Sequence, residues 1–162
     1  MVIAIIAVLS SIIIPSLNSA RKKAYENSAQ DEIMSLQTAL QMYLNDTNGV
    51  YPPDVARDLP AEIKTYLGNE GHEWPKAPWP GSVYDWDNWT IDGQRVVQIS
   101  IRFCPGGGPL SACQFPDEPW ATGFGVNSAY YYCIEGACRP HVGEPINYPG
   151  YCANCTVQPY TP

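Results

Sequence analysis

The feature that most constrains this chain is an apolar segment at its start that continues in helical register into an amphipathic one. Residues 1–14 carry two polar side chains, Ser10 and Ser11, and no charge. Beyond them, apolar residues recur at steps of three and four, the stripe of a helix with one buried face: Ala29, Ile33, Leu36, Leu40 and Tyr43. The sequence therefore predicts one helix from the start to about Thr47, on the order of 70 Å long.

Two signals act on this helix. Asn48-Gly49 is a C-cap signal, and the prolines at 52 and 53 prevent the helix from resuming. Pro15 lies inside the helix and removes one backbone hydrogen bond. Two interpretations of Pro15 are open: a kink or locally melted turn, or the end of one helix and the start of a second, capped within residues 16–18.

The apolar run is shorter than a membrane span. Fourteen residues rise about 21 Å as a helix, against a hydrocarbon thickness of roughly 30 Å. A cleaved signal peptide has its basic flank before the apolar run, whereas here Arg21, Lys22 and Lys23 follow it and the helical pattern continues. A helix that is apolar all round sits in lipid or in a protein core.

Residues 2–24, VIAIIAVLSSIIIPSLNSARKKA, resemble the N-terminal helix of type IV pilins and type II secretion pseudopilins in the apolar run, the proline and the basic cluster. The resemblance extends to about Tyr51, through DTNGVYP, which is similar to the family's junction between helix and head. It implies an α+β pilin fold, with a long N-terminal helix packed against a small antiparallel sheet and a disulfide-bonded, loop-rich C-terminal region.

The family's processed N-terminus, a methylated phenylalanine followed by a glutamate, has no counterpart in this sequence. Aligning Pro15 with the family's proline implies that about seven mature residues and a short leader precede Met1, which brings the apolar run to roughly 21 residues and a membrane-spanning length. We therefore expect the true start to lie upstream of Met1.

The resemblance divides the chain into a transmembrane and filament-core helix at 1–23, its amphipathic continuation at 24–48, and a globular head at 49–162. It implies a subunit that waits in the inner membrane and then enters an extracellular helical homopolymer, with identical subunits and the pilus assembly machinery as partners and a role in adhesion, motility or DNA uptake. The predicted filament-core residues are Val2, Ile3, Ile5, Ile6, Leu9, Ile12, Ile13, Ile14 and Pro15.

Two alternatives stay open. One is a pseudopilin of a type II secretion system, and the other is a membrane-anchored, sugar-binding surface domain that does not polymerise. A direct nucleic-acid partner is not expected, because the formal charge is -7 and phosphate binding needs clustered Lys and Arg, of which the head has almost none. Enzymatic activity is not expected either, because the sequence has no GxSxG motif and no paired His and carboxylate spacing.

In the head, hydrophobic alternation from Val97 to Phe103 predicts a half-buried strand. Asp92-Gly93 is a strong hairpin signal that pairs this strand with the segment around residues 86–91. A third apolar run at 129–134 precedes Glu135-Gly136, and residues 59–67 suggest a short helix or turn. We expect an antiparallel sheet laid over the helix stripe.

All six cysteines lie between residues 104 and 155, and they predict a disulfide framework in an oxidising compartment. A zinc site is not favoured, because the sequence has a single CxxC. A two-residue loop at Glu135-Gly136 places Cys133 opposite Cys138 in a pair that a disulfide can bridge. Elimination and proximity then give Cys104 to Cys113 and Cys152 to Cys155, although six cysteines allow fifteen pairings.

An aromatic cluster admits two interpretations. The cluster has five aromatic residues: Trp74, Trp79, Tyr84, Trp86 and Trp89. In a sugar-binding domain such rings would stack on sugars, but in a head with few Leu and Phe they are expected to fill the core.

Calcium is the one cofactor hypothesis that the residues suggest. Asp85, Asp87 and Asn88, with Asp92 nearby, offer the oxygen ligands that calcium prefers. Their spacing differs from the EF-hand pattern, and Asp-rich turns are common without a metal.

Overall fold

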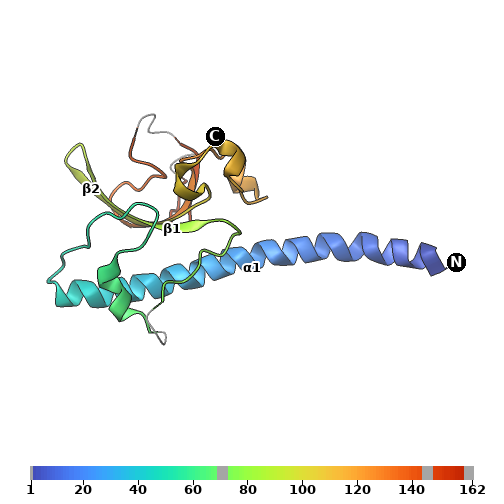
Figure 1. Ribbon diagram of the computed structural model, residues 1–162, viewed down its shortest axis with the longest axis horizontal. Helices are drawn as coiled ribbons and strands as arrows, with labels where there is room; N and C mark the ends of the chain where they lie inside the picture. Colours follow the sequence, from blue (N-terminus) through green and yellow to red (C-terminus); the bar gives the residue numbers. More distant parts are fainter. Residues whose placement is uncertain (1, 69–72, 144–147, 159–162) are drawn as a thin grey trace.

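The computed structural model describes residues 2–68, 73–143 and 148–158, and only the backbone of α1 before Ser16. A long helix, α1 (Val2–Asp46), carries a four-stranded sheet across its second half (Figure 1). The strands are β1 (Val83–Ile91), β2 (Gln94–Arg102), β3 (Ala129–Glu135) and β4 (Gly150–Cys152). Short 3-10 helices lie in the loops: η1 (Ala61–Tyr66), η2 (Pro105–Gly107), η3 (Leu110–Ala112) and η4 (Pro119–Ala121). The fold is α+β, as the sequence predicts.

The predicted long helix is confirmed. It ends as expected, because Asn48 and Gly49 both take positive φ, 57° and 81°, and the Gly49 N–H donates to the Leu44 carbonyl at 2.8 Å. The helical backbone persists across Pro15, so the melted turn and the two-helix interpretation are both wrong, while a kink at Pro15 stays a prediction. The backbone bonds on either side of one proline are sufficient to keep the helix continuous.

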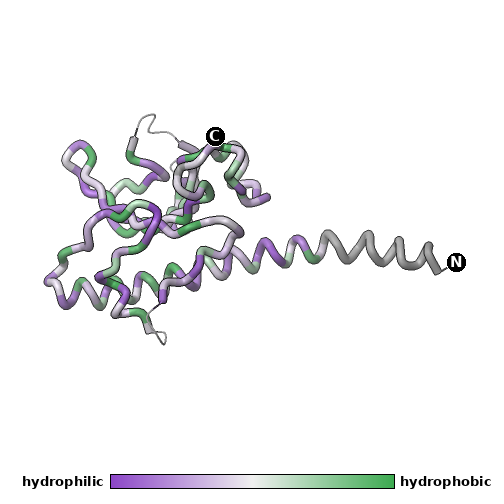
Figure 2. Tube along the Cα trace, in the orientation of Figure 1, coloured by the Kyte–Doolittle hydropathy of each residue, from purple (hydrophilic) through white to green (hydrophobic). Residues whose placement is uncertain are grey.

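One face of the second half of α1 forms the floor of the core. Ala29, Leu36 and Leu40 are fully buried and Ile33 is nearly so, as the stripe predicts. The outward face is mainly polar, and hydrophobic and hydrophilic positions alternate along this stretch (Figure 2). Burial of one face therefore holds this half of the helix to the head, while its other face stays in contact with solvent.

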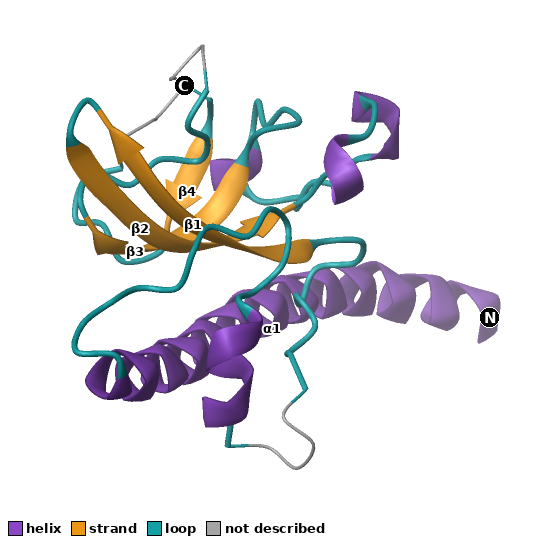
Figure 3. Cartoon of the chain, turned by 60° about the vertical axis from the view of Figure 1, so that its left-hand side comes forward, coloured by secondary structure: helices purple, strands orange, loops and turns teal. Residues whose placement is uncertain are grey.

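The sheet lies over one side of α1, and the turn of the β1–β2 hairpin points away from the helix (Figure 3). Ile91 pairs with Gln94 across the turn, and Asp92 and Gly93 take φ of 50° and 76°, so the predicted hairpin is confirmed. β3 runs antiparallel to β2, but β4 runs parallel to β3. The sheet is therefore mixed rather than wholly antiparallel, and its three-residue last strand is too short to show a pattern in the sequence.

The core between sheet and helix is aromatic. Trp79 lies at its centre, with ring centroids 5.6 Å from Phe103, 5.8 Å from Trp120 and 5.2 Å from Tyr130. Trp86 is fully buried, and Tyr84 is buried as well. Core packing is thus confirmed for three members of the predicted aromatic cluster, while Trp74 and Trp89 are half-buried at the margins of two apolar clusters.

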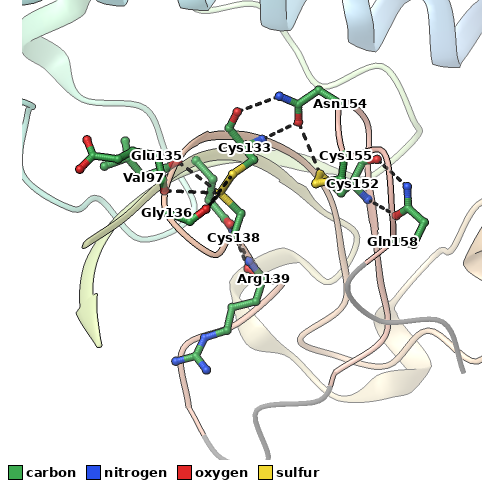
Figure 4. The surroundings of a disulfide bond; sticks show 11 residues. Val97, Cys133, Glu135, Gly136, Cys138, Arg139, Cys152, Asn154, Cys155 and Gln158 are labelled. Atoms are coloured by element: carbon green, nitrogen blue, oxygen red, sulfur yellow. Dashed lines mark hydrogen bonds between the residues drawn. A yellow bond between two sulfur atoms is a disulfide. The ribbon is translucent and has the colours of Figure 1, made fainter. Parts of the chain in front are cut away.

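Three disulfides close short loops in the head, and Figure 4 shows the surroundings of the one between Cys133 and Cys138. They join the pairs expected from the sequence: Cys104 with Cys113, Cys133 with Cys138, and Cys152 with Cys155.

The geometry behind one of these pairs differs from the expectation. The chain does not return as a strand after β3, so the predicted two-residue hairpin is wrong and the Cys133–Cys138 bond spans a tight turn. Gly136 is required at this turn, because its φ is 83° and a Cβ there would collide with the Arg95 carbonyl oxygen.

We expect Leu36→Ala to lower the free energy of unfolding by about 2–5 kcal/mol, because it opens a cavity in the floor of the core. Met34→Ala is the matched control on the opposite face, where 61% of the side chain is exposed, and it should change stability little. Thermal and denaturant unfolding of both variants tests this. Equal losses in the two variants would contradict the packing described here.

Peptide mapping of the unreduced protein checks the disulfides. We expect three linked peptides, each containing the two cysteines of one short loop. A peptide containing Cys104 or Cys113 joined to the segment after β4 would contradict this connectivity.

Candidate functional site

Residues 2–21 of α1 project from the head as a rod, and the rest of the helix lies along the head (Figure 1). Every side chain from Ser16 to Arg21 is exposed, and the first fully buried one is Ala29. The helix therefore changes role along its length, from a projecting element to a part of the head's core.

The apolar end of this rod is where sequence reasoning placed the filament core. Within the part of the chain that the structure describes, no helix carries an apolar stretch long enough to cross a bilayer. The predicted filament-core residues lie in the segment of α1 whose side chains fall outside that description, so their role stays a prediction: Val2, Ile3, Ile5, Ile6, Leu9, Ile12, Ile13, Ile14 and Pro15.

Glu32 links the helix to the sheet through a polar contact inside the interface. Its carboxylate accepts hydrogen bonds from the Tyr84 hydroxyl at 2.6 Å and the Ser28 hydroxyl at 2.9 Å. Burial, together with the hydrogen bond to Glu32 and its charge, raises the pKa of Tyr84 well above its usual value. Tyr84 therefore stays a hydroxyl donor across the physiological range and fixes the sheet on α1.

A groove of about 390 Å³ lies at the base of the head, between the helix and residues 114–118. Lys22 Nζ lies 3.0 Å from Asp117 Oδ2 across it, and the Tyr25 and Trp79 rings stand 6.5 Å apart on its wall. The Asp117 side chain is fully exposed, so this ion pair contributes little stability. The groove marks the level at which the rod separates from the head.

The face of the sheet turned away from α1 holds a buried ionic cluster. Arg102 is 3% exposed, and its Nε donates to Asp85 Oδ2 at 2.6 Å while its Nη2 reaches Asp87 Oδ1 at 3.3 Å. Its Nη1 also donates to the carbonyl oxygens of Asn127, at 3.1 Å, and Pro140. A single guanidinium thus joins β1, β2 and two loops.

Burial changes the pKa of the Asp87 carboxyl in this cluster. Burial raises the pKa of its carboxyl to about 7, against the opposing charge of Arg102 and with the aid of the Asp85 charge. Gln98 and Ser100 donate to its Oδ2 at 2.8 and 2.7 Å. The proton affinity of this carboxyl therefore belongs to the folded state.

A shallow pocket of about 170 Å³ opens over the cluster, with Arg57 and His141 on its wall. The Arg57 backbone N–H donates to Asp85, and Arg57 takes a positive φ of 58°. Burial and the positive charge of Arg102 lower the pKa of His141, so this imidazole is neutral at physiological pH. The charged groups at the base of the pocket, Arg102, Asp85 and Asp87, are already ion-paired with one another.

This arrangement bears on the calcium hypothesis. Asp85 and Asp87 face Arg102, and the Asn88 side chain donates to the Pro52 carbonyl at 2.7 Å and accepts from Arg95. Among the residues that the structure describes, no three His, Cys, Asp or Glu side chains are grouped to hold a metal ion. Calcium binding stays a prediction, and it requires the carboxylates to exchange Arg102 for the ion.

Three side-chain amides replace missing strand partners. Gln98 binds both backbone groups of Arg139, accepting from its N–H at 3.0 Å and donating to its carbonyl at 2.7 Å. Asn154 does the same for Cys133, and Gln158 for Cys152 (Figure 4). The segments that follow Cys138 and Cys152 are therefore held to the sheet without forming strands of their own.

The burial of polar side chains on the outer face of the sheet was not predicted from the sequence. The polar residues of β2 were expected on a half-buried strand, but Gln98 and Ser100 are fully buried together with Arg102. The signal for their burial was the pairing of opposite charges across the hairpin, Asp85 and Asp87 on β1 with Arg102 on β2, which hairpin register alone brings onto one face.

Comparison with known proteins gives a curated relative. The chain is similar to the type II secretion system core protein G of Vibrio cholerae serotype O1, with 33% identity over 103 residues, which cover 56% of this chain and 69% of that protein. No family model matches the chain, and no solved structure matches it.

The Asp87 carboxyl gives a pH prediction. Because its pKa is about 7 in the folded state and 3.8 ordinarily, the folded state holds a proton that the unfolded chain has lost. The stability contributed by Asp87 is complete below pH 3.8 and is lost as pH rises through 7, by about 1.4 kcal/mol per pH unit. We expect Asp87→Asn to remove this slope.

Urea unfolding of the wild type and variant at several pH values from 4 to 8 measures the effect. The exposed Asp117→Asn is the control and should leave the wild-type pH dependence intact. Parallel stability curves for wild type and Asp87→Asn would show that Asp87 keeps an ordinary pKa.

Proposed function

Because this chain belongs to the type IV pilin and pseudopilin family, we propose that it is a structural subunit of an extracellular, pilus-like helical filament. The observation that carries the proposal is the first half of α1, which projects from a head whose core is already complete without it. An apolar rod of this kind requires apolar surroundings that the subunit itself does not supply.

Two surroundings meet that requirement in succession. The rod sits in the inner membrane before assembly, and it then packs against the rods of identical subunits in the filament core. Transfer between lipid and neighbouring helices changes the hydrophobic free energy little, because both are apolar, so an assembly machinery can drive the step and close packing can retain the subunit. The nine predicted filament-core residues make these contacts.

The head forms the filament's outer surface in this proposal. It is attached to α1 by the aromatic core and the Tyr84–Glu32 hydrogen bond, which suits a unit that must move with its helix. We propose that it acts without catalysis and without a direct nucleic-acid contact, and that any calcium-dependent form would be confined to the face around Asp85. Adhesion, motility and DNA uptake are the roles open to such a filament.

A second candidate is a pseudopilin of a type II secretion system. The relative's name supports it, since that protein is a core component of such a system. The sugar-binding surface domain has less support, because Trp79 and Trp86, two of the rings on which it depends, lie in the core.

Electron microscopy of filaments sheared from cells that express the full-length protein tests the proposal. We expect this chain in the filaments, and we expect Ile13→Asp to abolish them because a charge in the rod is disfavoured both in lipid and between helices. Val157→Asp is the matched control, because Val157 is a head residue with 79% of its side chain exposed.

The two candidates give different outcomes. Filaments on the outer surface support the pilus, whereas loss of protein secretion in the Ile13→Asp strain without surface filaments supports the pseudopilus. Wild-type protein that remains a membrane monomer, with neither filaments nor a secretion defect, would refute the filament subunit altogether.

A further inference from the structure

We propose that Arg21, Lys22 and Lys23 form a cationic collar that binds the phosphate groups of anionic lipids where α1 emerges from the membrane. This proposal rests on the proposed function, because it requires the apolar rod to enter a bilayer. Beyond that function, it names anionic lipid as a partner. It also gives the collar a role, which is to set how deeply the subunit sits in the membrane before it is extracted.

The first observation is the segregation of charge along α1. The helix has three cationic side chains, and all of them occupy one turn at residues 21–23. Residues 2–20 are uncharged, and residues 24–46 contain acidic groups but no Lys or Arg. Cations that stabilise a helix through its dipole lie near its C-terminus. These three lie in the middle of α1, so we infer that they interact with a partner outside the helix.

The second observation is that the cations spread around more than half of the helix. Consecutive residues are about 100° apart, so three in a row fan across roughly 200° of the circumference. Arg21 and Lys23 are exposed on the flanks, and Lys22 lies against the head beside Asp117. A protein partner on one face of a helix is matched by cations three or four residues apart. A spread over more than half of the circumference is matched by a surface that the helix crosses.

The third observation is the height of the collar. Arg21 lies seven residues beyond Ile14, the end of the apolar run, which is roughly 10 Å along the helix. The headgroup layer on each side of a bilayer is roughly 5–8 Å thick. Long Arg and Lys side chains bend back toward an interface, which covers the remaining distance. The groove that begins at Asn18 and Arg21 marks the same level as the base of the head.

The charge of the rest of the molecule sharpens the proposal. The chain carries -7 overall, so the head alone is repelled by an anionic surface and the collar is the part that attracts it. Of the six cations of the head, Arg102 and Arg139 are buried and are not available to lipid, and the other four are scattered single charges in an acidic sequence: Arg57, Lys64, Lys76 and Arg95. The collar therefore holds the helix at the interface while the acidic head stays above it.

Vesicle flotation of the full chain tests the collar. The probes are vesicles of phosphatidylcholine alone and of phosphatidylcholine mixed with anionic phosphatidylglycerol, at low and at high salt. We expect tighter binding to the anionic vesicles, by about fivefold for each free cation near the surface, and we expect salt to remove this preference. The triple variant Arg21→Gln, Lys22→Gln, Lys23→Gln should lose the preference, by roughly 20- to 100-fold.

The matched control removes three cations of the head, Lys64→Gln, Lys76→Gln and Arg95→Gln, and so has the same net charge as the collar variant. It should keep the preference for anionic vesicles. Arg21→Lys should keep it as well, because the charge is retained. Unfolding midpoints of all variants exclude loss of fold as the cause.

The remaining outcomes separate this proposal from the proposed function. Equal binding of wild type to both kinds of vesicle overturns the collar but leaves the membrane stage of the filament subunit intact. Equal binding combined with loss of filaments in the collar variant assigns the three cations to acidic groups of neighbouring subunits instead. Failure of the wild type to float with either vesicle refutes both the collar and the membrane stage.

Discussion

The guanidinium of Arg102, buried on the outer face of the sheet, joins parts of the head that lie far apart in the sequence. It is paired with Asp85 and Asp87 on β1 and bonded to the carbonyls of Asn127 and Pro140 in two different loops. A buried charge is destabilising unless its partners are in place, so the loops must close correctly for the sheet to keep this residue inside. In a head with little regular structure, that requirement specifies where the loops go.

The two faces of the sheet are therefore stabilised by different kinds of interaction. Against α1, the contacts are apolar and aromatic, and their free energy follows from the area removed from water. On the outer face, the contacts are ionic and amide hydrogen bonds that satisfy buried polar groups. Gln98, Asn154 and Gln158 each supply the donor and acceptor that a strand partner normally provides, so short disulfide loops can pack onto a sheet that they do not extend.

This division explains what could be predicted from the sequence. The helix, its end at Asn48-Gly49 and the Asp92-Gly93 hairpin follow from local signals, namely periodicity, caps and turn residues, and all three are present. The parallel strand β4 and the burial of Gln98 and Ser100 depend on distant segments that cover them, and alternation with polar residues normally indicates a solvent-facing side. The close cysteine pairs needed only proximity along the chain, which is why the Cys133–Cys138 pair was predicted although its supposed hairpin does not form.

The same division bears on the proposal that the chain occupies first a membrane and then a filament. A folded head needs an interior that does not depend on what surrounds the rod, and here the aromatic core, the Arg102 cluster and three disulfides complete that interior behind the second half of α1. The exposed stretch from Ser16 to Arg21 makes few contacts with the head, so a change of partners along the rod leaves the head's interior unchanged. The rod and the head are coupled mechanically, because α1 is continuous from the rod into the core. The hydrogen bond between Tyr84 and Glu32 resists sliding of the helix beneath the sheet. A pull applied to the rod is therefore transmitted to the sheet through contacts between α1 and the sheet within the subunit itself.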